Sequence, residues 1–332
     1  MRNRIITLFV VMLVMSFTAF AQDAPNFAFP RKVSAEALTQ LDKALKSGDG
    51  KVVVDALVRY SLAQSSISKQ QIDSIMPQIE QVAQQECRLD IKALLYHLEA
   101  SVLYSYYNRY GGQKEIVDTL PSRYERWSKG QINDKLHELV NLSLNDEKTL
   151  LGCPLRNYSD IIKEDSLGMC KSLFQFLALQ GYLMVHEDDV LRRLMANCDP
   201  GSELHMLAVK TSLLSPLHLE LLGVEEPMNG SEVAKLYYDK YKASESAGML
   251  LPEIDDEELW EDYVARYPNG RHTPAVKNKI SRLKTKSLKV RPIGECTPRD
   301  SIKLWVDSKN VDAFKLNFYR INDDVKDQRS YK

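Results

Sequence analysis

The stretch of residues 287–321, SLKVRPIGECTPRDSIKLWVDSKNVDAFKLNFYRI, differs in pattern from everything before it. Apolar and polar residues alternate over residues 302–307 and again over residues 314–319. Short alternating runs are typical of half-buried β-strands. The polar link at residues 308–312 suits a hairpin between the two runs. A third strand is predicted over residues 288–293, so the end of the chain is expected to be rich in β-structure.

Three strands are too few to close a β-sandwich, which needs roughly seven. A strand left at an open edge also invites pairing with other chains. The sequence ends about a dozen residues after Ile321. We therefore expect this chain to be the front part of a larger protein, and residues 287–332 to be strands that open a further β-domain.

A family resemblance is carried by eight residues of the same stretch. They are Ser308, Asn310, Val311, Phe314, Leu316, Phe318, Tyr319 and Arg320. After a long helical lead and a helix that ends in Tyr-Pro, this segment resembles the entry to the first macroglobulin-like domain of the alpha-2-macroglobulin-like proteins of Bacteroidetes-type bacteria. Residues 172–178, SLFQFLA, resemble an element in the helical part of the same proteins. The resemblance implies an N-terminal, non-catalytic module with a scaffold or interaction role in protease trapping.

No functional residue is carried over from that family. The thioester of that family needs a Cys-x-Glu-Gln motif. The four-residue segments that start at the five cysteines of this chain read CRLD, CPLR, CKSL, CDPG and CTPR. No bait segment is recognisable either, so both features are expected only beyond Lys332. We assign no catalytic, cofactor-binding or metal-binding residue, and we expect the chain not to be an enzyme.

Residues 1–21 have the pattern of a cleavable signal peptide. Arg2 and Arg4 precede an apolar run over residues 5–17, and Ala19-Phe20-Ala21 is a cleavage site of the A-x-A type. Gln22 follows the predicted cut, where a lipoprotein would have cysteine. The alternative is a single membrane anchor. Cleavage after Ala21 predicts a periplasmic or secreted protein with no remaining membrane span, and residues 22–33 are expected to form a linker.

A helical array is predicted over residues 34–284, because apolar residues recur there at three- and four-residue spacing. No constant repeat length holds across it, so the array is expected to be irregular. Its last helix pair, around Pro268 and Pro274, resembles a tetratricopeptide-like unit. The predicted helices cover residues 34–47, 52–63, 68–82, 90–107, 132–144, 173–186, 188–197, 202–214, 231–244, 255–268 and 273–283. Ser34 is expected to cap the first of them, and Pro77 is expected to kink or restart the third. Residues 149–165 are predicted to form a loop, and residues 217–222 form a short apolar piece.

Two polar or aromatic clusters have both a functional and a structural interpretation, and a third has a structural one. The tyrosines at positions 104, 106, 107 and 110 suit either a binding platform or helix packing. Residues 186–189, His-Glu-Asp-Asp, suit either a cation site or a solvated helix end. Residues 255–258, Asp-Asp-Glu-Glu, are expected at a helix N-terminus, which favours negative charge.

The cysteines leave two alternatives open. Cys87, Cys153, Cys170, Cys198 and Cys296 are odd in number, so they cannot all pair within the chain. Either Cys153–Cys170 or Cys170–Cys198 suits a disulfide, and buried free thiols suit most of the five. No C-x-x-C motif is present, which argues against zinc or thioredoxin-like chemistry.

Three functional hypotheses follow. The first is the N-terminal module of an exported alpha-2-macroglobulin-like protein. The second is a free-standing periplasmic helical-repeat adaptor that binds another envelope protein. The third is a hydrolase whose site is assembled in space from distant residues. With 44 basic and 45 acidic residues and a net charge of −1, nucleic acid is not an expected partner.

Overall fold

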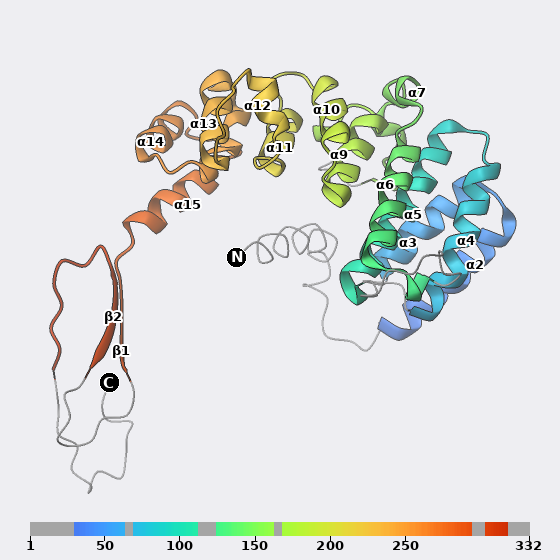
Figure 1. Ribbon diagram of the computed structural model, residues 1–332, viewed down its shortest axis with the longest axis horizontal. Coiled ribbons are helices and arrows are strands. Elements are labelled where there is room, and N and C mark those ends of the chain that lie inside the picture. The colour runs from blue at the N-terminus through green and yellow to red at the C-terminus, as the bar shows by residue number, and fades with distance from the viewer. Residues whose placement is uncertain (1–29, 64–68, 112–123, 163–167, 294–302, 318–332) are drawn as a thin grey trace, which may run out of the picture. The chain divides into compact units, whose positions relative to one another are not determined.

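The computed structural model describes residues 30–63, 69–111, 124–162, 168–293 and 303–317. This part of the chain is mainly helical, with one two-stranded antiparallel sheet near its C-terminal end (Figure 1). The predicted signal peptide, Ser68, Cys296 and residues 318–332 lie outside these ranges. The chain divides into two compact units, Met1–Glu253 and Ile254–Lys332.

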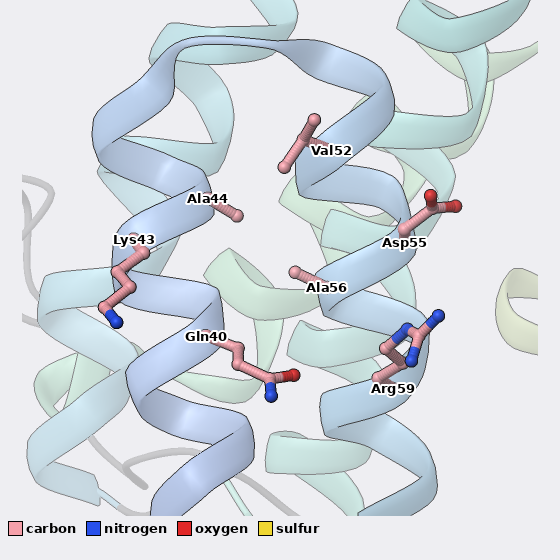
Figure 2. A pocket seen from close by; sticks show the side chains of 7 residues that line it. All are labelled: Gln40, Lys43, Ala44, Val52, Asp55, Ala56 and Arg59. Atoms are coloured by element: carbon pink, nitrogen blue, oxygen red, sulfur yellow. The ribbon is translucent and has the colours of Figure 1, made fainter.

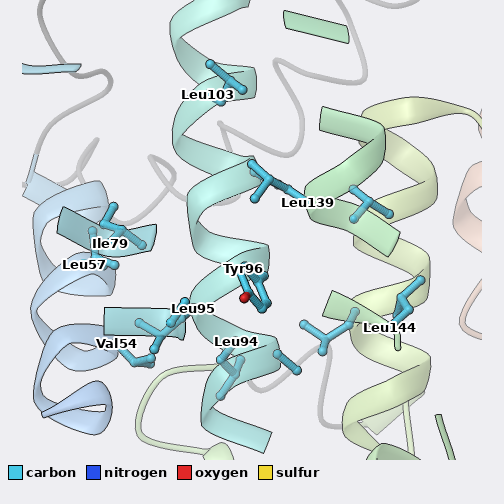
Figure 3. Packing of buried hydrophobic residues seen from close by; sticks show 14 of the residues in the cluster. Val54, Leu57, Ile79, Leu94, Leu95, Tyr96, Leu103, Leu139 and Leu144 are labelled. Atoms are coloured by element: carbon cyan, nitrogen blue, oxygen red, sulfur yellow. The ribbon is translucent and has the colours of Figure 1, made fainter. Parts of the chain in front are cut away.

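The first half of the first unit packs around one long helix, α5. Its apolar positions lie on more than one side, so α5 contacts α3 and α4 on one flank and α6 on another. Figure 3 shows Leu95 and Leu103 of α5 among side chains from these neighbours; both are fully buried. The helices are α2 (Pro30–Ser47), α3 (Gly50–Ala63), α4 (Lys69–Gln85), α5 (Leu89–Tyr110), the 3₁₀ turn η2 (Tyr124–Arg126), α6 (Lys129–Ser143) and α7 (Glu147–Leu151).

The second half of this unit is built on α9, whose apolar sequence suits a central position. Leu173, Phe174 and Leu177 are fully buried, and α9 packs against α5, α6, α7 and α10. This confirms the predicted helix at residues 173–186. The elements are η3 (Leu155–Tyr158), α9 (Leu173–Val185), α10 (Asp188–Ala196), α11 (Glu203–Thr211), α12 (Leu217–Leu222), α13 (Gly230–Tyr241), η4 (Glu245–Met249) and η5 (Leu251–Glu253).

Several predicted boundaries were wrong. α2 begins at Pro30, so Ser34 lies inside the helix and does not cap it. α4 continues through Pro77 to Gln85 without a restart. The predicted loop at residues 149–165 contains the end of α7 and all of η3. Short helical turns of this kind are missed because they are too brief to show a helical period.

The second unit contains α14 (Glu257–Arg266), α15 (Thr273–Lys284) and the two strands. The sequence had suggested one array through residue 284, whereas contacts group this helix pair with the strands. Trp260 and Tyr263 of α14 are buried, and the Trp260 indole N–H donates to the carbonyl of Ile254 at 3.0 Å. Pro274 lies in the first turn of α15, where its missing N–H costs no helical hydrogen bond.

The predicted hairpin pairing was wrong. Strand β2 (Leu304–Lys309) pairs antiparallel with β1 (Ser287–Pro292), with Val290 opposite Val306, and no strand is assigned to residues 310–317. Asn310 has a left-handed backbone with φ of 53°, and its side-chain amide donates to the carbonyls of Leu283 and Thr285. Asn310 thereby turns the chain out of the strand and ties it to the end of α15. Phe318 and Tyr319 lie outside the described ranges.

No helix among the residues that the structure describes is long and apolar enough to cross a membrane.

Candidate functional site

The hairpin β1–β2 has two chemically different faces. Side chains alternate between the faces of a sheet, and directly opposed residues share a face. Lys289, Arg291, Trp305 and Asp307 therefore lie on one side, where the Arg291 guanidinium stands 4.3 Å from the centre of the Trp305 ring. The other side carries the residues that we call the apolar face: Leu288, Val290, Leu304 and Val306.

Two residues of the apolar face are exposed in the part of the chain that the structure describes, and the other two, Val290 and Leu304, are half-buried. Leu288 and Val306 each expose 39% of their surface. Phe314 and Leu316, in the segment after β2, each expose 42%. A two-stranded hairpin is marginally stable in water unless its apolar face packs against another element. The apolar face is therefore a candidate interface for further β-structure.

A second candidate lies on the first unit, between α2 and α3. Figure 2 shows Ala44, Val52 and Ala56 directed into the space between the two helices. They form the floor of a shallow groove of about 330 Å³, which we call the α2–α3 groove. Its edges carry Gln40, Lys43, Asp55 and Arg59. The apolar floor and mixed-charge edge suit contact with an apolar side chain of another protein.

Glu99 of α5 is a buried carboxyl group with no hydrogen bond. Its side chain is fully enclosed, and neither oxygen has a partner within the described ranges. Lys135 of α6 is the nearby cation, and its ammonium pairs with Glu80 at 3.3 Å and with Glu138 at 3.0 Å. The pKa of Glu99 is raised to about 8, and burial is the largest cause. The positive charge of Lys135 lowers this pKa, and the negative charges of Glu80 and Glu138 contribute to the increase. The sequence had shown Glu99 only as a polar residue within an apolar run.

Ser212, His218 and Tyr237 form a chain of buried side chains. Ser212 Oγ lies 2.8 Å from His218 Nε2, and His218 Nδ1 lies 3.1 Å from the Tyr237 hydroxyl. Ser212 donates its own proton to the carbonyl of Ala208 at 2.5 Å. Its oxygen therefore accepts from Nε2–H, and Nδ1 accepts from Tyr237. Burial lowers the pKa of His218, which keeps the ring neutral.

This arrangement differs from the serine–histidine pair of a hydrolase. An activated serine gives its proton to the histidine, whereas Ser212 gives it to a backbone carbonyl. The three side chains are also buried, with exposed fractions of 3%, 0% and 2%. The chain joins α11, α12 and α13, and its geometry suits packing between these helices.

The acidic runs lie at helix ends. Glu187 pairs with His137 at 3.0 Å, and Asp188 accepts a hydrogen bond from Ser215, both at the start of α10. Asp256 caps α14 by accepting from the backbone N–H of Leu259, as its sequence position predicted. Across the described ranges, no group of three or more His, Cys, Asp or Glu residues could hold a metal ion.

The four tyrosines of α5 pack against the hydrophobic core. Tyr106 is buried, with 2% of its surface exposed, and its ring centre lies 5.1 Å from that of Tyr110. Tyr104 and Tyr107 are half-buried against the same core. This agrees with the packing interpretation of the stripe.

The chain matches no protein-family model, and neither a curated protein nor a solved structure is similar enough to be matched to it.

Proposed function

We propose that this chain is the N-terminal, non-catalytic module of an exported alpha-2-macroglobulin-like protein, with a scaffold or interaction role in protease trapping. In this proposal the helices form the lead, and residues 287–332 begin the first macroglobulin-like domain. Its partners are other proteins, including proteases that the full-length protein would hold.

The observation that supports this proposal is the open apolar face of the hairpin. Val290 and Val306 lie opposite each other on the apolar face of the hairpin, and the other face carries charged residues such as Lys289 and Asp307. One apolar and one polar face is the pattern of one layer of a two-layer β-fold. Among the residues that the structure describes, no second layer covers Leu288 and Val306. Further strands of the same protein would supply it.

The first test is the reading frame beyond the codon for Lys332. A frame that continues through many short alternating strands to a bait-like or thioester-like segment would support the proposal. A stop codon directly after Lys332 would contradict it. The full gene product should then form a stable complex with an added protease, detected as co-elution in gel filtration.

The apolar face allows a sharper test with two matched substitutions. Val306→Asp should destabilise the protein that extends through the next β-domain by about 2–4 kcal/mol, because it places a charge between two layers. Lys289→Asp on the opposite face should change the stability of the same protein by less than about 1 kcal/mol. Equal effects of the two substitutions would argue against a covering layer.

The alternative is a free-standing periplasmic helical-repeat adaptor that binds another envelope protein. The α2–α3 groove favours it, since Val52 exposes 46% of its surface at the floor. Val52→Asp should then weaken binding of a purified partner at least tenfold by calorimetry. Leu142→Asp, at an exposed apolar residue of α6 outside the groove, is the control. A partner that binds both variants equally would rule out the groove.

A further inference from the structure

Cys170 and Cys198 are two buried thiols on segments that lie side by side. Cys170 comes just before α9 and exposes 2% of its surface. Cys198 follows α10 and exposes 8%. Both are free thiols in the structure.

Contacts on both sides of this pair hold the two segments together. Lys171, next to Cys170, forms an ion pair with Asp199, next to Cys198. The amide of Gln175 donates to the carbonyl of Asn197 at 2.6 Å. The ion pair and the hydrogen bond therefore hold residues that flank Cys170 against residues that flank Cys198.

Both thiols have a raised pKa. Burial raises the pKa of Cys170 to about 12, and negative charge on Cys198 contributes to the increase. Burial likewise raises the pKa of Cys198 to about 12. Burial therefore holds each sulfur as a neutral thiol.

Cys153, the other candidate partner of Cys170, is out of register with it. Pro154 and Ser172 form an antiparallel bridge, and Leu173 donates its N–H to the carbonyl of Cys153 at 2.9 Å. Cys153 thus lies opposite residue 173, three positions from Cys170. The register of this bridge therefore does not place Cys153 opposite Cys170.

We infer that Cys170 and Cys198 form a disulfide bond when the protein folds in the presence of a disulfide oxidant. One thiolate attacks the oxidant's disulfide and forms a mixed disulfide with release of one thiol. The second cysteine then attacks the sulfur of the first cysteine in this mixed disulfide, which forms the S–S bond between them and releases the other half of the oxidant as the second thiol. The two cysteines lose two electrons and two protons, and the oxidant's disulfide takes them up as two thiols.

The bond would close a loop of about 28 residues that contains α9 and α10. Closing a loop of this size restricts the unfolded chain, so the oxidised protein should melt roughly 5 °C or more above the reduced protein. Because both thiols are buried and neutral, oxidation of the folded protein should be slow, and refolding is the better starting point.

The experiment uses the chain with Cys87, Cys153 and Cys296 replaced by serine. It is refolded from the reduced, denatured state with oxidised and reduced glutathione, and then denatured and treated with a maleimide. We expect the mass to fall by two hydrogen atoms, with no maleimide added until a reductant opens the bond. Two maleimides on the refolded protein, or only a glutathione adduct, would overturn the inference.

A matched variant tests the choice of partner. It keeps Cys153 and Cys170 and carries serine at positions 87, 198 and 296. Under the same conditions it should take up two maleimides. If Cys153 and Cys170 form a disulfide to the same extent as Cys170 and Cys198, the fold does not select the bond, and the inference is overturned. The same holds if Cys170 and Cys198 form their disulfide equally well in urea, where the protein is unfolded.

Discussion

Gly181 of α9 lies against Val140 of α6 with no room for a side chain. A Cβ placed on Gly181 would stand 2.8 Å from Cγ1 of Val140, closer than real Cβ atoms approach another heavy atom. Val140 is fully buried, so it has little freedom to move aside. This one glycine therefore sets how closely α6 and α9 approach each other.

Gly181→Ala should destabilise the protein by about 1–2 kcal/mol in urea unfolding. Overpacking costs about 1–3 kcal/mol, and the better helix propensity of alanine offsets up to about 1 kcal/mol of it. Val140→Ala should relieve the clash, so the double mutant should be more stable than the sum of the single effects predicts. Gly130→Ala in α6 meets only Ser128 Oγ at 3.8 Å and should be neutral or stabilising. Destabilisation by both alanines would contradict the packing argument.

Glu99→Gln should stabilise the protein increasingly as the pH rises. The pKa of Glu99 in the folded protein is about 8, above the ordinary 4.5, so the folded state keeps its proton longer than the unfolded state. The contribution of Glu99 to the free energy of unfolding is therefore fully present below pH 4.5 and is lost as the pH rises to about 8. At pH 7 the gain from glutamine should be of order 3 kcal/mol.

Urea unfolding at several pH values between 4.5 and 9 measures this gain. Asp42→Asn is the control, because that side chain pairs with Lys46 at the surface, where 51% and 71% of the two side chains are exposed. An exposed pair contributes at most about 1 kcal/mol. A stability difference between wild type and Glu99→Gln that does not change with pH would contradict the prediction.

Tyr237→Phe should cost about 1–3 kcal/mol, because it leaves Nδ1 of the buried His218 without its donor. Tyr241→Phe, at a half-buried ring that stacks on Tyr237, should change stability by less than about 0.5 kcal/mol. Thermal unfolding of the two variants at pH 7.5 gives the comparison. Equal shifts in Tm would mean that the hydroxyl of Tyr237 does not support His218.

Acid should weaken the same region. The pKa of His218 is lowered by burial, so the folded state takes up its proton less readily than the unfolded state. The contribution of His218 to the free energy of unfolding is therefore fully present above pH 6.5, the ordinary pKa of histidine, and is lost as the pH falls below 6.5. His205, whose pKa burial lowers to about 4, adds to this loss. The test uses the Glu99→Gln variant, because Glu99 in the wild type has the opposite pH dependence. A Glu99→Gln protein that is equally stable at pH 7 and pH 4.5 would contradict this prediction.

Gln175→Ala should destabilise the protein by about 2–3 kcal/mol. Gln175 completes a capping box with Ser172 at the start of α9 and also donates to the carbonyl of Asn197, all in a buried setting. Asn229→Ala removes the exposed capping box of α13 and should cost about 1 kcal/mol. Denaturant unfolding of both variants checks the order, and a larger loss for Asn229→Ala would contradict it.

Long elements with a strong period were predictable from the sequence. The helix expected at residues 173–186 is found as Leu173–Val185, and the helix expected at residues 188–197 is found as Asp188–Ala196. The strand that contains Val306 was also predicted. Each of these depends on local spacing of apolar residues and on local turn chemistry, which a single sequence contains.

The candidate sites were only partly predictable. Alternation indicated that residues near Val306 have one apolar face, but not which strand pairs with them. Glu99 and His218 gave no signal, because a buried polar residue looks like a surface residue until its neighbours are known. The capping box of Ser172 and Gln175 does have a signal in the sequence, because Ser-x-x-Gln stands directly at the start of an apolar run.

The sequence determined the helical character of most of the chain, the β-rich character of its end and the two faces of the hairpin, since these follow from propensity and periodicity within a few residues. Only the tertiary structure decided that β2 pairs with β1, that Gly181 meets Val140 and that Cys170 lies beside Cys198. Each of those contacts joins residues more than ten positions apart. Such contacts form because the whole set of apolar faces is buried together, and no local pattern specifies that packing.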